Sequence, residues 1–483
     1  DEEGMMDNSM PDVAAQHTQN TSFVPIMGQT QPPFQPSSTP VGLQRRYLVW
    51  NSVGIIVSRQ EHTHSAIQID FHDANLHRPV RFLDRYNYVV AALSSTGAIF
   101  ASANSESGPS TIFYKPFDAW GNKSEWLFQL EDQEEVKCCA IGKKWAAVAT
   151  SQNYLRVFSY SGLQLDVKSL PGPIVSMCGN DNLLAVVFSV YGALQYWLLD
   201  INKNKFVHQG MLPVSPGSTL SWVGFTWNLN NLASFDSKGV VRMLLSKNYT
   251  WIPVLHSNKN TKGKSDTVWP IYVTPENLMC HVCKGQRNYP ETLPRPVPQA
   301  MPIRMPLLNL ASESEKLQEQ HTRQKAILEE QDIQGMATTN KDKIKLDKII
   351  LLNFKNACKA SRSVRALDLS TRLMRKKSLD AAIIMANHMN QNQLVERMNI
   401  LMQGKEAAQR LAASTVKSSF AAPTRTALKP RKSVSHTPKS NKSVASKAKR
   451  TIVNKTPGKD FKNPFAVKKQ AQDAASTNVF AEE

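Results

Sequence analysis

The sequence predicts a six-bladed β-propeller followed by an α-helical bundle. Over residues 43–300, short apolar runs rich in Val, Ala and aromatic residues alternate with tight polar turns. Corresponding runs recur about every 40–48 residues, close to the ~40–45-residue period of four-stranded propeller blades. After the proline-rich stretch Thr292–Pro298, the apolar residues follow helical spacing instead.

One repeat shows the strand pattern clearly. Trp145–Thr150 and Leu155–Ser159 are apolar runs separated by the polar turn 151–153, and Leu163–Leu170 then alternates apolar and polar residues up to a Pro-Gly-Pro sequence. This pattern is typical of a meander of antiparallel strands. A single meander exposes two apolar faces, so it needs neighbours of its own kind.

The corresponding strands lie near Tyr47, Tyr88, Cys138, Val175, Leu220 and Val268. Six such units can close into a ring, which removes the exposed sheet edges that an open meander would leave. A β-sandwich is the alternative, because sandwiches have the same strand spacing.

The helical pattern covers residues 301–412. The expected helices are Ser312–Gln334, Lys341–Lys359, Ser363–Met374, Leu379–Met389 with Ser378 as its N-cap, and Gln393–Met402. Their short connections favour a compact antiparallel bundle.

Both ends of the chain have compositions typical of disorder. Residues 1–42 are rich in Gln, Pro, Ser and Thr, and we expect a disordered linker. The first residue is Asp1 rather than Met, which suggests a fragment of a longer polypeptide. Residues 413–483 carry too few apolar residues to offset the cost of ordering the backbone, and we expect a disordered basic tail.

Most of the positive charge lies in this tail. Residues 414–483 contain 15 Lys and Arg against 4 Asp and Glu, which gives +11 of the total net charge of +19. Such residues attract DNA phosphates without reading sequence, so we expect weak, non-specific DNA binding. A nuclear import signal is the alternative. The candidate residues are Arg431, Lys432, Lys439, Lys442, Lys447, Lys449, Arg450, Lys468 and Lys469.

The six cysteines do not have the pattern of a disulfide scaffold, and adjacent Cys138 and Cys139 suit reduced, buried thiols. We find no signal peptide. The longest apolar stretch, Leu183–Ile201, is interrupted at residues 191–192, so two strands explain it better than a membrane span.

The sequence indicates no metal, cofactor or catalytic site. Cys280 and Cys283 have the spacing of half a zinc site, but no second pair follows, so we interpret them as strand residues. Lys262–Ser265 resembles the end of a phosphate loop but lacks the upstream glycine. No known catalytic motif is present.

Two predicted helices could form a groove for a partner. Small residues on one helix opposite large apolar residues on the next leave a channel for an amphipathic helix. The alternative is that all of these residues belong to the core of the bundle. The candidates are Ile350, Leu351, Phe354, Cys358, Ala381, Ala382, Met385 and Ala386.

An ordered set of segments resembles the second half of a replisome adaptor family. This family is known as WD-repeat and HMG-box DNA-binding protein, or chromosome transmission fidelity protein four. The resemblance lies in Arg45–Ile56, Phe71–Asp73, Gly142, Trp145–Ser151, Leu170–Met177, Asp236–Leu244, Lys262–Asp266, Cys283–Gly285 and Thr292–Pro296, and continues more loosely to about residue 412.

The resemblance implies a six-bladed propeller and a helical domain assembled as a homotrimer in the nucleus. It implies that the helical domain binds short helical peptides of the GINS complex and of DNA polymerase α, and thereby tethers primase to the replicative helicase. Family members also carry an amino-terminal WD40 propeller, which this sequence lacks. Some end in an HMG box, where this chain has only the basic tail.

We therefore expect a non-enzymatic replisome scaffold with no cofactor and no membrane association. One alternative is a general nuclear propeller adaptor for chromatin or RNA-processing complexes. Another is a propeller enzyme with a pocket on the ring axis.

Overall fold

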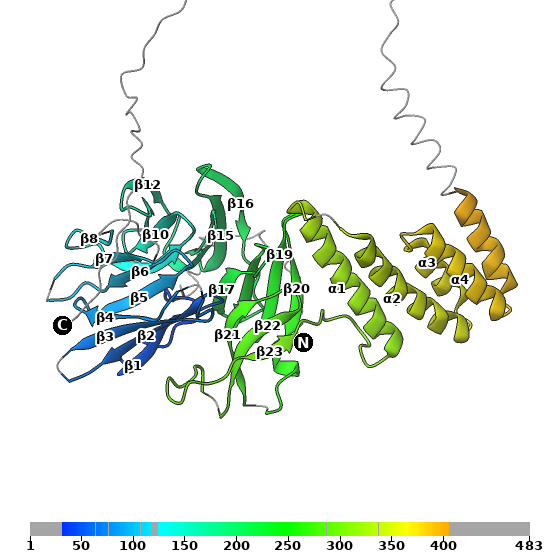
Figure 1. Cartoon of the computed structure of the whole chain (residues 1–483), viewed down its shortest axis with the longest axis horizontal. Coiled ribbons are helices and arrows are strands. Elements are labelled where there is room, and N and C mark those ends of the chain that lie inside the picture. The colour runs from blue at the N-terminus through cyan, green and yellow to red at the C-terminus, as the bar shows by residue number, and fades with distance from the viewer. Residues whose placement is uncertain are drawn as a thin grey trace, which may run out of the picture. The chain divides into compact units, whose positions relative to one another are not determined.

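The computed structural model describes residues 31–404 except 63, 76, 107, 118–123, 264, 286 and 337. It contains six small antiparallel sheets followed by a series of helices (Figure 1). The prediction of a six-bladed propeller followed by helices is confirmed. The sandwich alternative is wrong, because the strands form six separate sheets rather than two stacked ones.

Each sheet is one blade, and its strands pair in chain order. Blades 1 and 2 contain β1 (Arg45–Trp50), β2 (Gly54–Gln60), β3 (Ser65–Phe71), β4 (Val80–Asp84), β5 (Tyr88–Leu93), β6 (Gly97–Ser102), β7 (Thr111–Pro116) and β8 (Trp126–Gln129). Blades 3 and 4 contain β9 (Val136–Ile141), β10 (Trp145–Thr150), β11 (Tyr154–Ser159), β12 (Gln164–Ser169), β13 (Ile174–Asn180), β14 (Leu183–Val190), β15 (Ala193–Asp200) and β16 (Lys205–Met211). Blades 5 and 6 contain β17 (Leu220–Phe225), β18 (Leu232–Asp236), β19 (Val240–Leu245), β20 (Thr250–His256), a short 3-10 turn (Ser257–Lys259), β21 (Thr267–Val273), β22 (Asn277–Cys283) and β23 (Gln299–Pro302).

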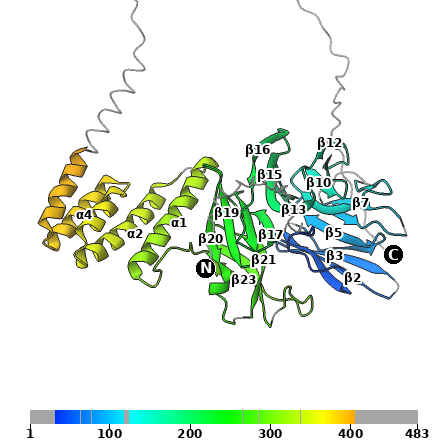
Figure 2. The same cartoon turned by 180° about the vertical axis from the view of Figure 1, so that it is seen from behind.

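The first strand of each blade is its innermost strand. Contacts join β1 to β5, β5 to β9, β9 to β13, β13 to β17 and β17 to β21, and aromatic side chains of β1 pack against Trp269 of β21. The remaining strands of each blade extend outward (Figure 2). Apolar side chains from facing sheets fill the spaces between blades. For example, Trp145 of blade 3 and Phe188 of blade 4 share one buried cluster. The core is therefore divided among the blade interfaces.

An aromatic cluster closes the ring between blades 6 and 1. Trp50 of β1 lies with its ring centroid 4.5 Å from that of His281 and 6.2 Å from that of Trp269. His281 is buried, and burial lowers its pKa to about 4. It therefore stays uncharged at neutral pH and packs as a third ring of the cluster. Blade 6 has three strands in the described part of the chain, so side-chain packing rather than a shared strand makes this joint.

Residues 31–41, named here the axial segment, line the central channel of the ring. Gln35 donates from Nε2 to Cys139 O (2.8 Å) and accepts from Cys139 N at Oε1 (3.1 Å). Ser37 donates to Pro270 O and accepts from the Trp222 indole, each at 2.9 Å. Further hydrogen bonds reach blades 1, 4 and 5; they are Thr39 N to Tyr47 O, Phe34 N to Val175 O, and the paired bonds between the Gln31 amide and Leu220.

The axial segment corrects the expected extent of the linker. We expected residues 1–42 to be disordered, but Gln35, Ser37 and Thr39 are all buried in the structure. The innermost strands leave one edge of backbone groups unpaired toward the axis, and these groups need partners. A polar segment rich in Gln, Ser and Thr can supply them without an apolar core. Residues 1–30 lie outside the described part.

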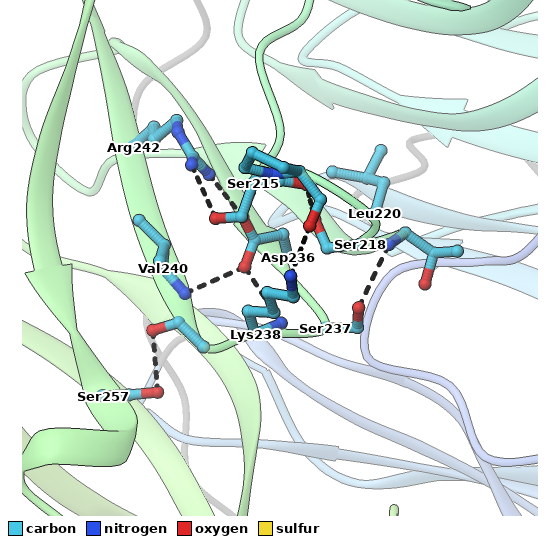
Figure 3. Close-up of polar contacts among 12 residues, drawn as sticks. Ser215, Ser218, Leu220, Asp236, Ser237, Lys238, Val240, Arg242 and Ser257 are labelled. Atoms are coloured by element: carbon cyan, nitrogen blue, oxygen red, sulfur yellow. Dashed lines mark hydrogen bonds and ion pairs between the residues drawn. The ribbon is translucent and has the colours of Figure 1, made fainter. Parts of the chain in front are cut away.

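A buried carboxylate organises blade 5 (Figure 3). Asp236 is 1% exposed and accepts from the Arg242 guanidinium (2.6 Å), from Ser215 Oγ (2.7 Å) and from the backbone N of Ser215, Lys238 and Val240. Burial alone would raise the pKa of Asp236, but these hydrogen bonds outweigh it and leave the pKa lowered. The carboxylate thus fixes the turn between β18 and β19 and pairs Arg242, whose side chain is 14% exposed.

Replacing Asp236 by Ala should destabilise the propeller by about 3–5 kcal/mol, because it leaves the Arg242 charge buried and unpaired. The free energy of unfolding in urea measures this change. Glu291→Ala is the matched control, since its ion pair with Arg287 is exposed on both sides and should contribute less than about 1 kcal/mol. Equal effects of the two substitutions would contradict the role given to Asp236.

The helices follow blade 6. They are α1 (Glu313–Ile333), α2 (Asn340–Lys359), α3 (Ser363–Thr371), α4 (Lys376–His388) and a last helix over 392–404. Thr339 and Asp342 form a capping box at the start of α2. None of the helices in the described part of the chain is long and apolar enough to cross a membrane.

The expected N-cap of α4 is wrong. Ser378 lies inside α4, and Asp347 of α2 does the capping instead. The Asp347 carboxylate accepts from the backbone N of Met374 (2.8 Å) and of Arg375 (3.2 Å), and from Ser378 Oγ (2.6 Å). A carboxylate from a neighbouring helix thus binds two backbone N–H groups directly before α4 and the Ser378 hydroxyl in its first turn.

Candidate functional site

The helical domain, α1–α4 with residues 392–404, contains the predicted groove residues. Five of the eight lie in the interior of the helices, where Phe354, Ala382 and Ala386 are fully buried. Ile350 and Cys358 are 2% and 3% exposed in the same cluster. These five residues therefore belong to the core of the bundle, which is the alternative stated above. A peptide could reach them only if the helices moved apart.

The other three predicted residues are only partly buried. Leu351 of α2 and Met385 of α4 pack against the edge of this cluster, and Ala381 is half-buried on α4. The structure thus brings the α2 and α4 residues together, and only part of the set is accessible. As a peptide groove, the set remains a prediction.

Sequence analysis missed the most exposed apolar residue of α4. Ile384 is 57% exposed, and it lies one turn from Ala381 and His388 on the outer face of the helix. Helical periodicity could have placed Ile384 on the face opposite Ala382 and Ala386. The wide apolar stripe hid this, because Ile383, Ile384 and Met385 are consecutive.

The outer face of α2 is basic. Lys341, Lys345, Lys348, Lys355 and Lys359 are all exposed and fall on one side of the helix, with half-exposed Leu352 among them. Residues 339–404 contain 13 Lys and Arg against 5 Asp and Glu, a net charge of +8. This surface therefore favours an acidic partner.

α1 attaches the helical domain to blade 5. Glu330 is 1% exposed, and its carboxylate accepts from Asn231 Nδ2 (2.7 Å) and from the backbone N of Ser246 (3.0 Å). Asn231 also donates to Leu244 O, so one side chain joins β19 to the helix. Glu319 accepts from Met305 N (2.9 Å) in the connection between β23 and α1. These buried contacts fix the position of α1 on the blade.

The channel through the ring has a cavity at each mouth. A cavity of about 290 Å³ lies where the innermost strands end, and Gln35–Ser37 of the axial segment line it. A larger cavity of about 880 Å³ lies where these strands begin. The axial segment contributes to the walls of both.

The remaining candidate residues fall in two places. Cys280 and Cys283 lie in β22, where burial raises the pKa of both thiols, that of Cys280 to about 12. Among the residues that the structure describes, no group of three or more His, Cys, Asp or Glu side chains could hold a metal ion. The nine basic residues of the predicted DNA-binding tail lie outside the described part.

Two family models match the chain, and their boundary coincides with the end of the propeller. Residues 32–307 match "Minichromosome loss protein, Mcl1, middle region", and residues 313–408 match "DNA polymerase alpha-binding protein Ctf4, C-terminal domain". The chain belongs to the Mcl1/Ctf4 family. The first match starts within the axial segment, so that segment is part of the region common to the Mcl1/Ctf4 family.

Curated relatives agree with this assignment. The chain is 31% identical over 401 residues to WD repeat and HMG-box DNA-binding protein 1 of Homo sapiens, which covers 79% of the chain and 35% of the relative. It is 26% identical over 451 residues to the DNA polymerase alpha-binding protein of Saccharomyces cerevisiae, with 77% and 48% covered. Minichromosome loss protein 1 of Schizosaccharomyces pombe is 29% identical, with 77% and 49% covered. The chain thus spans about a third to a half of the length of these Mcl1/Ctf4 relatives.

Replacing Glu330 by Ala should lower the free energy of unfolding by about 3 kcal/mol, because Asn231 and the Ser246 N–H lose a buried charged acceptor. Glu329→Ala is the control, since Glu329 pairs with Lys247 at the surface and should matter little. Urea denaturation of both variants measures the difference. A loss of similar size in both would mean that the buried contact does not hold the domain.

Proposed function

We propose that this chain is a non-enzymatic adaptor of the DNA replication machinery. As a homotrimer, it couples the replicative helicase, through the GINS complex, to DNA polymerase α–primase in the nucleus. The observation that supports this best is the match of residues 313–408, the helical domain, to the C-terminal domain of a DNA polymerase alpha-binding protein. The helical domain is also the part of the structure with accessible apolar side chains beside a basic face.

The partner segment is an acidic amphipathic helix. Its apolar side contacts the edge formed by Leu351, Met385 and Ile384, and its acidic side meets the lysines of α2. Methionine suits such a contact because its flexible side chain adapts to different partners. The charge of +8 over residues 339–404 raises the rate at which an acidic segment associates.

A second copy of the chain covers the outer edge of blade 3 in the proposed trimer. β12 is the outermost strand of this blade, and Leu163, Leu165 and Val167 at and before it are 66%, 52% and 45% exposed. Alternate residues of a strand lie on one face, so these three form an apolar strip. An exposed apolar edge strand promotes uncontrolled association unless a specific partner covers it.

The double variant Leu351→Glu, Met385→Glu should weaken peptide binding at least tenfold, because both residues lose apolar contact and repel an acidic helix. Fluorescence anisotropy with helical peptides of GINS and of polymerase α measures the affinity. Ile384→Glu should have the same effect, and Val364→Glu, an 80% exposed residue of α3, is the control.

Mass measurement in solution accompanies this experiment. Each variant should keep the mass of a trimer, which shows that folding and assembly are intact. A folded, trimeric double variant that binds its peptides as before would place the groove elsewhere. A monomeric wild-type chain would refute the homotrimer.

The basic tail contributes weak DNA binding in this proposal. If about four of its nine candidate residues engage phosphates, affinity should fall about 100-fold between 50 and 200 mM salt, because counterion release governs such contacts. Electrophoretic mobility shifts with duplex DNA at several salt concentrations measure this dependence. Replacing the nine residues by Gln should abolish the shift, whereas replacing nine tail Ser and Thr by Ala should not. An affinity independent of salt would refute this mode of binding.

A further inference from the structure

The larger mouth of the channel contains a buried positive charge that has no partner among the described residues. This mouth is the cavity of about 880 Å³ at the start of the innermost strands. Its walls include Val41 of the axial segment, Arg46 of β1, Val89 and Val90 of β5, Lys137 of β9, and Asp266. These residues come from four parts of the chain that are far apart in sequence.

Arg46 is 6% exposed, and its Nε atom is buried without a hydrogen-bond partner. Among the residues that the structure describes, no carboxylate forms an ion pair with it. Burial lowers the pKa of Arg46 to about 10, which still leaves the guanidinium charged at neutral pH. An unpaired charge in such a place is unfavourable unless an anion joins it.

Two other arginines of the propeller that are only slightly exposed each have a carboxylate. Arg156 binds Glu134 through two parallel hydrogen bonds of 2.9 and 2.7 Å, and Arg242 binds Asp236 at 2.6 Å. Both arginines lie on the third strand of their blades, so the fold pairs a partly buried guanidinium there. Arg46 lacks such a partner although it borders a cavity large enough for a ligand.

The other charges of the cavity already have partners. Lys137 Nζ lies 2.7 Å from Glu135 Oε2, and Asp266 accepts from the backbone N of Gly263 at 2.9 Å. Among the described residues that line the cavity, Arg46 is therefore the charged side chain without a polar partner, and the aliphatic side chains of Val41, Val89 and Val90 share the cavity with it. A ligand that matches this arrangement carries one negative charge beside an apolar group. A polyphosphate would bring several charges that find no partners here.

We propose that this mouth of the ring binds a carboxylate-bearing ligand, whose carboxylate pairs with Arg46 and whose apolar part packs against the valines. The planar guanidinium offers the paired N–H groups that a carboxylate accepts. An acidic side chain of a partner peptide and a free organic acid share this chemistry. The site lies on the ring axis and does not depend on the peptide edge of the helical domain.

The experiment measures the thermal stability of the full chain in sodium acetate and in sodium chloride at equal ionic strength. Acetate should raise the Tm of the wild-type chain by on the order of 2 °C near saturation, because a ligand that binds only the folded state stabilises it. Arg46→Met should remove this response and should have the higher Tm in chloride, since it removes an unpaired buried charge. Arg45→Met, the adjacent arginine of β1, is the matched control and should respond as the wild type does.

A second arm distinguishes the two sources of the carboxylate. The tripeptide N-acetyl-Val-Asp-Val-amide is compared with its Asn counterpart and with isobutyrate. A stabilisation that needs the Asp side chain and exceeds that by isobutyrate identifies a peptide, and the reverse order identifies an organic acid. Inorganic phosphate should have the weakest effect of these probes.

Two results would overturn the proposal. One is that acetate does not raise the Tm of the wild-type chain, or that it raises the Tm of the wild type and of Arg46→Met equally. The other concerns residues 1–30, which contain five acidic residues (Asp1, Glu2, Glu3, Asp7 and Asp12) and no Lys or Arg. If acetate acts only after these five are replaced by Asn and Gln in the full chain, the chain supplies its own carboxylate and no external ligand is needed.

Discussion

The propeller depends on how it satisfies the inner edges of its blades. Each blade begins with its innermost strand, which pairs with the second strand on one side and presents the other edge to the axis. Buried backbone groups that lack hydrogen-bond partners are costly. The axial segment supplies hydrogen-bond partners through its polar side chains. The Gln35 amide both donates to and accepts from the backbone of Cys139, as a residue of a neighbouring strand would. Ring closure thus involves a segment that belongs to no blade.

Three buried carboxylates of the chain each join structural elements by hydrogen bonds. Asp236, Glu330 and Asp347 each accept several hydrogen bonds from elements that they hold together, namely a turn, a blade and a helix, and the start of α4. Each one replaces apolar packing at a joint where backbone N–H groups need partners. Arg46 differs from these three residues, because it is a buried charge that borders a cavity and has no ion-pair partner in the described part of the chain.

The helical domain divides its apolar residues between core and surface. Phe354 and Ala382 hold the helices together, Leu351 and Met385 pack against the edge of the same cluster, and Ile384 is exposed on the outer face of α4. In the proposed function, a binding surface that borders the core would be rigid before a partner arrives, which limits the entropy lost on binding. The lysines of α2 would favour the acidic partner proposed above. Attachment of α1 through Glu330 keeps this surface fixed to the ring.

The sequence by itself determined the class and order of the domains, because strand and helix periodicity and the spacing of turns are local properties. It also determined the bounds of the helices to within a few residues, and α2 begins within one residue of the predicted helix. Tertiary structure alone decided the features that depend on distant partners. The polar residues at 31–41 become ordered only because the innermost strands offer them unpaired edges. Ser378 is not the N-cap that we expected, and Asp347 binds the backbone at the start of α4 from another helix. The residues of the predicted groove divide into core and surface residues. The neighbouring helices decide which face of each helix is buried, and the local sequence pattern does not identify these neighbours.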